Sequence, residues 1–366
     1  MPYLVLCVGD RPDAPRPDSQ RSEMNAEAGV KVIRIGFDEL VTLLRSILER
    51  HGAPFAIADI LARNCATAER DGAESHGVFR IPGYVATLES GYVTANATPV
   101  LEDASPALLR VDACNGFAVP ALATARATAL DKVRACGVAV VAIRDSHHFS
   151  ALWIDVEPFA REGLVAATFV NGFSRIAPYS GHQRFYGTNP MALAVPRQSG
   201  DPLVFDQASS AMAYGDIRIA AREGRQVPPG TGLDRHHQPT TDPNAILDGG
   251  AILPFGGHKG SSISMMVELF AAALCGGSFS FEVNRDAYPT AETSRSGQLV
   301  LLIDPSRGAM RDYAARVDDL VAGLRGAGQS RLPGDRRYAH RRDAAQKGIP
   351  LPARTLADLQ ALCDGK

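Results

Sequence analysis

Apolar side chains recur at helical spacing early in the patterned part of the chain. Six of them fall on one face of an expected helix: Phe37, Leu40, Val41, Leu44, Ile47 and Leu48. Gly52 ends that helix, and Pro54 opens a second one that is expected to run into Ser75 and His76. An Ala-rich helix is expected from Pro120 to about residue 136. The pattern therefore predicts that the chain begins with helices.

Short, continuous apolar runs in the middle of the chain predict buried strands at residues 138–143, 165–170, 191–195, 202–205 and 299–303. Further helices are expected at 153–162, in part of 208–222, at 263–274, at 310–324 and from Thr355, whereas 223–248 predicts a long surface loop. Helices at both ends and strands between them predict an α/β fold. We expect a helical domain over 34–115 plus 310–366 and a central sheet domain over 116–309.

The N-terminal segment differs in composition from the rest of the chain. Residues 1–9 are apolar but lack the basic region of a secretory signal, and residues 10–21 are rich in Pro, Asp, Arg and Ser. We therefore expect residues 1–33 to be a disordered or mis-annotated extension, with the true start at Met24.

Composition narrows the class of protein. The 366 residues are 45% hydrophobic and 21% charged, which is typical of a soluble protein with a sizeable core. A net charge of −2 without a basic block argues against nucleic acid and anionic membranes as partners. Six scattered cysteines without a CxxC pair argue against a zinc ribbon or a disulfide framework, and favour a reducing cytoplasm.

The segment 71–80 carries the strongest candidate chemistry. A hydroxyl (Ser75), an imidazole (His76) and a guanidinium (Arg80) lie within six residues, and Gly77 leaves room for close backbone approach. A proton donor, an orienting group and a carboxylate-binding group suit the reduction of a small acidic substrate. A solvated loop before a helix is the competing interpretation, because the spacing alone is not specific.

Other polar motifs suggest ligand-binding loops. No G-x-G-x-x-G follows a strand, so a Rossmann nucleotide site is not supported. Residues 256–261 place glycines, a cation and a hydroxyl before a helix, which fits an anion cradle or an ordinary Gly-rich turn. His147 and His148 are adjacent, so their side chains point apart and do not share a metal. Residues 331–337 hold three arginines, which suit phosphate groups or a solvated loop.

Taken together and in order, the motifs resemble a known family. They are Ser75-His-Gly with Arg80, Ser146-His-His-Phe149, Phe185-Tyr-Gly-Thr-Asn-Pro190, Val204-Phe-Asp206, Leu253-Pro-Phe-Gly-Gly-His-Lys-Gly260 and Leu332-Pro-Gly-Asp335. Over residues 34–350 the chain resembles the type-2 malate/L-lactate dehydrogenase family of NAD(P)-dependent oxidoreductases. Within it, the chain is most similar to the bacterial Δ1-piperideine-2-carboxylate/Δ1-pyrroline-2-carboxylate reductases.

The resemblance implies a non-Rossmann α/β fold with a largely antiparallel central sheet, which binds NAD(P), and a homodimer. It implies NADPH-dependent (or NADH-dependent) reduction of a cyclic imine carboxylate to L-pipecolate or L-proline. The arginines of 331–337 favour NADPH, since they could receive a 2′-phosphate.

The resemblance also implies roles for individual residues. His76 would be the proton donor, with Ser75 and Asp216 completing its relay, and Arg80 and Thr188 would hold the substrate. The cofactor would contact four segments: His148, Phe149, Ser150, Ala151 and Leu152; Asp206, Gln207 and Ala208; His258 and Lys259; and Arg331, Leu332, Pro333, Gly334, Asp335, Arg336 and Arg337.

Asp216 separates two substrate classes at the sequence level. A carboxylate there would repel a dicarboxylate such as malate and favour an iminium nitrogen or a protonated imidazole. The alternatives are a 2-keto acid/2-hydroxy acid dehydrogenase of the malate or lactate type, a phosphotransferase built on residues 256–261, and a nucleotide-binding protein without catalysis.

Overall fold

The fold is built on a seven-stranded sheet with the strand order β2-β3-β4-β11-β5-β6-β7. The computed structural model describes residues 31–308 and 311–365. Only β3 and β4 run parallel, joined by a crossover helix, and every other neighbouring pair is antiparallel. The strands are β2 (Val100–Ser105), β3 (Leu108–Phe117), β4 (Val138–His148), β5 (Val165–Val170), β6 (Met191–Val195), β7 (Leu203–Gln207) and β11 (Ser294–Ile303). This largely antiparallel α/β architecture confirms the expected fold class.

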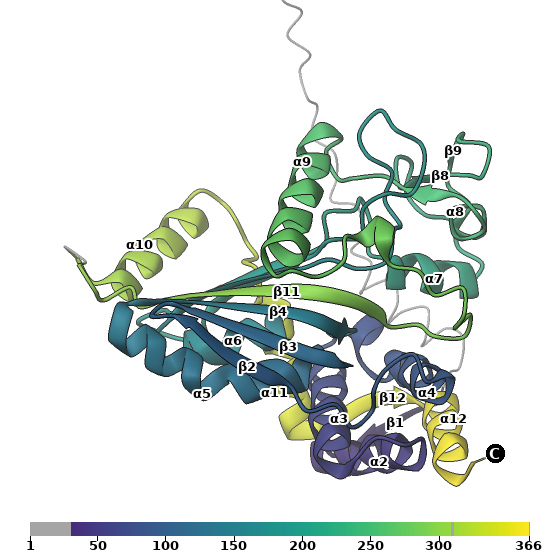
Figure 1. The fold of residues 1–366 in the computed structure, drawn as a ribbon, viewed down its shortest axis with the longest axis horizontal. Helices are drawn as coiled ribbons and strands as arrows, with labels where there is room; N and C mark the ends of the chain where they lie inside the picture. Colours follow the sequence, from purple (N-terminus) through teal and green to yellow (C-terminus); the bar gives the residue numbers. More distant parts are fainter. Residues whose placement is uncertain (1–30, 309–310, 366) are drawn as a thin grey trace, which may run out of the picture.

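Each face of the sheet is covered by helices (Figure 1). The crossover helix α5 (Ala118–Cys136) and helix α6 (Trp153–Arg161) cover one face, and the main hydrophobic core lies between them and the strands. On the other face, helix α9 (His258–Val267) continues into the π-helix η3 (Glu268–Leu274). There Phe270 packs against Phe169 of β5, with ring centroids 5.1 Å apart.

A helical layer joins the two ends of the described chain. Helices α2 (Phe37–Arg50), α3 (Phe55–Arg70), α4 (Ile81–Ser90) and α12 (Ala353–Asp364) pack with the antiparallel pair β1 (Val32–Ile35) and β12 (Ile349–Pro352). The apolar face predicted for α2 is the face that is buried. Each fully buried Leu or Ile there stabilises the fold by roughly 1.5–3 kcal/mol.

A third, smaller hydrophobic cluster lies around helix α7 (Tyr214–Arg222) (Figure 1). It includes Ile217, Ile246 and Ile252, and it is bordered by helix α8 (Pro243–Leu247) and a small sheet of the order β10-β8-β9. The strands of this sheet are β8 (Gly232–Leu233), β9 (Pro239–Thr240) and β10 (Ala251–Ile252). The predicted long loop 223–248 therefore contains two short strands and a short helix.

Several expectations from the sequence need correction. Residues 100–115, assigned to the helical domain, form β2 and most of β3, which belong to the central sheet. Residues 32 and 33, assigned to the extension, are part of β1. The strand expected at 138–143 continues to His148, and helix α11 (Asp335–Lys347) was not among the expected helices.

Helix α10 (Tyr313–Gly326) begins later than the expected residue 310, and residues 309 and 310 lie outside the described part. Residues 1–30, with the start expected at Met24, also lie outside it. Within the described residues, no helix is both long enough and apolar enough to cross a bilayer. The division into two domains stays a prediction.

Candidate active site

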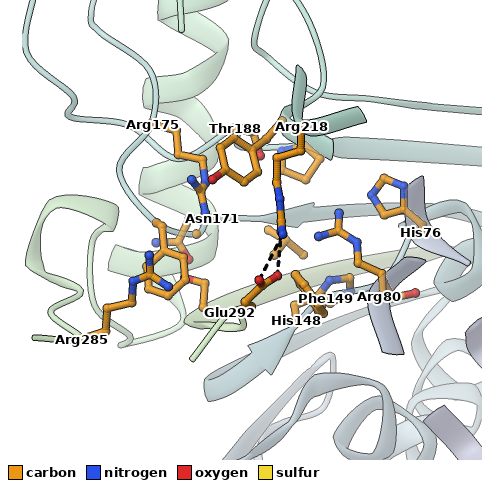
Figure 2. Close-up of a pocket in the computed structure, with 17 residues that line it drawn as sticks. His76, Arg80, His148, Phe149, Asn171, Arg175, Thr188, Arg218, Arg285 and Glu292 are labelled. Carbon is orange, nitrogen blue, oxygen red and sulfur yellow. Dashed lines mark hydrogen bonds and ion pairs between the residues drawn. The ribbon is translucent and has the colours of Figure 1, made fainter. Parts of the chain in front are cut away.

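A cavity of about 300 Å³ opens where the helical layer, the sheet and helix α7 meet (Figure 2). The lining side chains come from segments far apart in the sequence. They are His76, Arg80, His148, Phe149, Ser150, Val170, Asn171, Phe173, Arg175, Thr188, Pro190, Tyr214, Arg218, Arg285, Glu292 and Ser294, together with Gly172. The structure therefore brings together six of the predicted site residues: His76, Arg80, His148, Phe149, Ser150 and Thr188.

Two single-turn 3₁₀ helices, η1 (Glu74–His76) and η2 (Val78–Arg80), carry the predicted catalytic segment. The expectation of a longer helix running into Ser75 and His76 is therefore wrong. The buried carboxylate of Glu69, on α3, accepts a 2.9 Å hydrogen bond from the amide of Val78 and holds the two turns in place. A Cβ at Gly77 would collide with that carboxylate. The close approach that Gly77 was expected to allow is therefore made by the side chain of Glu69.

His76 is oriented by its neighbour. The hydroxyl of Ser75 lies 3.1 Å from Nδ1 of His76, which leaves Nε2 as the ring nitrogen available to a molecule in the cavity. Burial lowers the pKa of His76 well below its usual value, and the positive charge of Arg80 and the neighbouring His148 lower it further. A neutral imidazole is therefore favoured before an anion enters the cavity.

Arg80 is prepared to bind an anion. Its guanidinium lies over the ring of Phe149, with 4.1 Å between the guanidinium carbon and the ring centroid. Its Nε is buried and has no hydrogen-bond partner among the described residues. Burial lowers the pKa of Arg80 to about 10, and it stays charged at neutral pH. Donors of this kind fit the carboxylate of a small substrate.

The two adjacent histidines of β4 face opposite sides, as expected for neighbours on a strand. His147 is buried between Thr293 Oγ1 (2.8 Å from Nδ1) and Asn115 Oδ1 (3.0 Å from Nε2). Burial lowers its pKa to about 3. His148 faces the cavity, and its Nε2 lies 2.8 Å from the buried carboxylate of Asp155.

An ion pair in the middle of the cavity was not predicted. Arg218 makes two hydrogen bonds to Glu292, of 2.7 and 3.1 Å (Figure 2). The backbone amides of Glu292 and Thr293 donate to Thr87 Oγ1 on α4, which fixes this end of β11. Arg218 lies four residues after Tyr214 on α7, and that spacing could have indicated a shared face, whereas nothing near Glu292 marks it.

Glu268, at the first position of the π-helix, organises the wall that carries Thr188. Its buried carboxylate accepts hydrogen bonds from the side chains of Asn189 (2.8 Å) and Asn171 (3.3 Å) and from the amide of Ser280 (3.0 Å). Asn189 has a φ of +40°, a conformation that its amide contacts stabilise. π-Helical turns occur often at functional sites.

Asp216 does not line this cavity. It is exposed in the first turn of α7, directly after Gly215, which packs against Ser75. Its place in a relay to His76 stays a prediction, and Glu292 is the carboxylate that faces the cavity.

The other predicted cofactor residues lie in separate places. Ala151 and Leu152 are buried in the core, while Asp206, with Gln207 and Ala208 after it, accepts a 3.0 Å hydrogen bond from the amide of Trp153. Arg337 lies with its guanidinium 5.1 Å from the Trp153 ring centroid. A second cavity is lined by Leu332, Pro333 and Asp335. The predicted residues Arg331, Gly334 and Arg336 are their neighbours in the sequence. His258 and Lys259 begin α9, where His258 packs on Tyr179.

Comparisons with known proteins agree with this architecture. The model of the malate/L-lactate dehydrogenase family matches residues 35–360. A Δ1-pyrroline-2-carboxylate/Δ1-piperideine-2-carboxylate reductase from Pseudomonas syringae pv. tomato is 55% identical over 90% of this chain and 96% of its own length. The reductase of the same name from Pseudomonas putida is 52% identical over 93% of this chain and 99% of its own.

A solved structure extends the similarity to three dimensions. The crystal structure of Δ1-piperideine-2-carboxylate reductase from Pseudomonas syringae matches with a TM-score of 0.89 at 55% identity. The match covers 90% of this chain and 99% of that one. The chain belongs to the malate/L-lactate dehydrogenase family.

Proposed function

We propose that the protein reduces the cyclic imine acids Δ1-piperideine-2-carboxylate and Δ1-pyrroline-2-carboxylate to L-pipecolate and L-proline, with NAD(P)H as the reductant. The observation that carries this proposal is the meeting of His76 and Arg80 in one cavity. One residue can supply a proton and the other can hold a carboxylate. The names of the relatives at 52–55% identity support the substrate class.

The residues present fit a dinucleotide with phosphate groups. Arg337 lies beside Trp153 and Asp206, and its buried Nε has no hydrogen-bond partner among the described residues. The adjoining Leu332–Arg336 segment, taken with Arg337, offers further backbone and guanidinium donors. When bound, the nicotinamide supplies a hydride to C2 of the substrate.

The protein's own residues place the substrate and move the proton. Arg80 binds the 2-carboxylate, which turns the C=N bond toward His76. Burial is the main cause of the low pKa of His76, and the positive charge of Arg80 adds to it. An anion bound at Arg80 offsets that charge, which raises the pKa and favours protonation of the imidazole as the substrate arrives. Nε2 then donates that proton to the ring nitrogen as C2 accepts the hydride, and the C=N bond becomes a C–N single bond.

A 2-keto acid reductase of the malate or lactate type is the second candidate. Asp216 was expected to disfavour diacids, but it does not line the cavity, whereas four arginines do. A cationic cavity of this kind would tolerate open-chain keto acids as well.

A substrate panel tests the choice between them. NADPH oxidation would be followed by absorbance with the two cyclic imines, pyruvate and oxaloacetate side by side. We expect kcat/KM for a cyclic imine to exceed that for either keto acid by at least about tenfold, and the reverse order would support the second candidate. Repeating the assay with NADH decides the cofactor preference, which we propose to be NADPH. We also propose a homodimer, which light scattering would test.

A further inference from the structure

Two arginines on the far side of the cavity have no role in the mechanism above. Arg175 lies in the loop after β5, and Arg285 lies between the 3₁₀ helix η4 (Ser280–Glu282) and β11. Both guanidinium groups lie over the ring of Phe173, at 5.6 and 4.8 Å from its centroid. Arg175 also lies over Tyr214, at 3.3 Å. The two cations therefore share one aromatic ring.

The carboxylate that lines the cavity does not pair with either of these arginines. Glu292 is the carboxylate among the lining residues, and both of its oxygens are bonded to Arg218. Arg175 has Tyr214 as its side-chain partner, and Arg285 donates to the carbonyl of Ala291. Aromatic rings and carbonyls stabilise a cation without neutralising it.

Such an arrangement is unfavourable without an anion. Burial lowers the pKa of Arg175 to about 10, and the charge of Arg285 contributes to the shift. Two like charges in one partly buried site repel each other, and removing them from water adds a further cost. An anion placed between them would relieve both effects, and guanidinium groups bind acidic groups through paired hydrogen bonds.

We propose that Arg175 and Arg285 form a second anion-binding subsite, which takes an acidic group other than the carboxylate held by Arg80. In Figure 2 the two arginines lie on one side of the cavity, His76 and Arg80 lie on the other, and the Arg218–Glu292 pair stands between them. One carboxylate therefore does not serve both groups. The assignment of Arg80 rests on the proposed function.

The anionic group has two possible sources, a second carboxylate on the substrate or a phosphate of the cofactor. If it belongs to the substrate, the cavity accepts cyclic imine diacids. The second carboxylate would then lie on the other ring carbon that is bonded to the nitrogen. Pyridine-2-carboxylate and pyridine-2,6-dicarboxylate are matched, unreactive probes that differ only in that group. Reduced nicotinamide fluorescence reports NADPH binding separately.

Calorimetry would measure both pyridine acids on the wild-type full chain and on the Arg175→Gln and Arg285→Gln variants. Arg316→Gln, on the exposed surface of α10, is the matched control. We expect the wild type and the control to bind the diacid at least about tenfold tighter than the monoacid. In either cavity variant that ratio should fall toward one, while the dissociation constant of the monoacid changes less than about threefold. Thermal melting would confirm folding, and the second variant keeps the test valid if the first does not fold.

The other outcomes are equally informative. A ratio near one in the wild type, with NADPH binding weakened at least about tenfold in both variants, would support the subsite with a cofactor phosphate as its anion. A wild-type ratio above about tenfold that stays unchanged in both variants would overturn the subsite. A ratio near one together with unchanged NADPH binding in both variants would overturn it as well. Both measurements follow binding without turnover, so a chain that reduces no imine would defeat the proposed function and leave this test standing.

Discussion

The chemistry of the cavity depends on how single residues alter each other's charge. His76 lies next to Arg80, and burial together with that positive charge lowers the pKa of the imidazole. Arg80 in turn is held by Phe149 and lacks a hydrogen-bond partner at Nε among the described residues. We propose that the substrate carboxylate completes this charge arrangement.

Replacing His76 by alanine tests the proton donor. A positioned general acid contributes roughly 10²–10⁴ in rate, so kcat for imine reduction should fall by at least about 10². The affinity for NADPH, measured by fluorescence, should change little. His236→Ala, an exposed histidine in the loop between β8 and β9, should keep the wild-type rate. A loss below about threefold in His76→Ala would remove His76 from this role.

His147 gives a prediction about stability and pH. Its pKa is about 3 in the folded protein and about 6.5 in an unfolded chain, so the unfolded state binds more protons between these values. The contribution of His147 to the free energy of unfolding is therefore fully present above pH 6.5 and is lost as the pH falls toward 3. When the pH falls from 7.5 to 5.0, protonation of His147 in the unfolded state should lower the free energy of unfolding by roughly 2 kcal/mol.

The measurement is urea unfolding at the two pH values. His147→Gln removes the titrating group, so its loss of stability between pH 7.5 and 5.0 should be smaller than that of the wild type by roughly 2 kcal/mol. His236→Gln, exposed in its loop, should behave as the wild type. An equal pH dependence in His147→Gln and the wild type would show that another group carries the effect.

At the scale of elements, the site depends on a tight contact between α3 and the turns η1 and η2. A Cβ at Gly77 would collide with the buried carboxylate of Glu69, which also holds the amide of Val78. Gly77→Ala should therefore lower the free energy of unfolding by about 1–3 kcal/mol and reduce kcat/KM, because His76 and Arg80 would move. Chemical denaturation and steady-state kinetics would measure the two effects.

A second glycine provides the control for this prediction. Gly323 lies inside α10, and a Cβ there would have nothing within 4 Å. Gly323→Ala should leave the activity unchanged and stabilise the helix slightly, by up to about 1 kcal/mol. If Gly77→Ala proves as stable and as active as Gly323→Ala, the contact does not position the site.

The sequence predicted those elements whose own pattern decides their structure. The apolar stripe of α2 fits only a helix with one buried face, and the continuous apolar run of β5 fits a buried strand. The structure has both elements. Strand β2 was missed because nearly all of its side chains are exposed and half of them are polar, so no buried face marks it. Helix α11 was missed for a similar reason, since only Tyr338 and Ala344 of its residues are buried.

The candidate site was predictable only in part. The local motif of Ser75, His76 and Arg80 could be recognised in the sequence. Four further charged residues come together only when separate segments meet in one cavity: Arg175, Arg218, Arg285 and Glu292. No local spacing links Glu292 to Arg218, because 74 residues separate them. The charge argument at Asp216 stays a prediction, since this residue does not line the cavity and its direction on α7 depends on tertiary packing.

At the scale of the whole molecule, the cavity lies where three hydrophobic clusters approach one another. The helical layer contributes His76 and Arg80, and the sheet contributes His148 and Ser294. Helix α7, in the third hydrophobic cluster, contributes Arg218 (Figures 1 and 2). A ligand that contacts all three would link them. Its binding would therefore stabilise the folded chain as a whole.

The central claim is that His76 meets a reduced nicotinamide across a cyclic C=N bond. A crystal structure with NADPH and pyridine-2-carboxylate tests it most directly. We predict that the carboxylate lies on Arg80, that His76 Nε2 is within hydrogen-bond distance of the ring nitrogen, and that the nicotinamide C4 lies about 3–3.5 Å from the ring carbon bearing the carboxylate. A nicotinamide bound away from His76, or a ring nitrogen facing another side chain, would contradict the account.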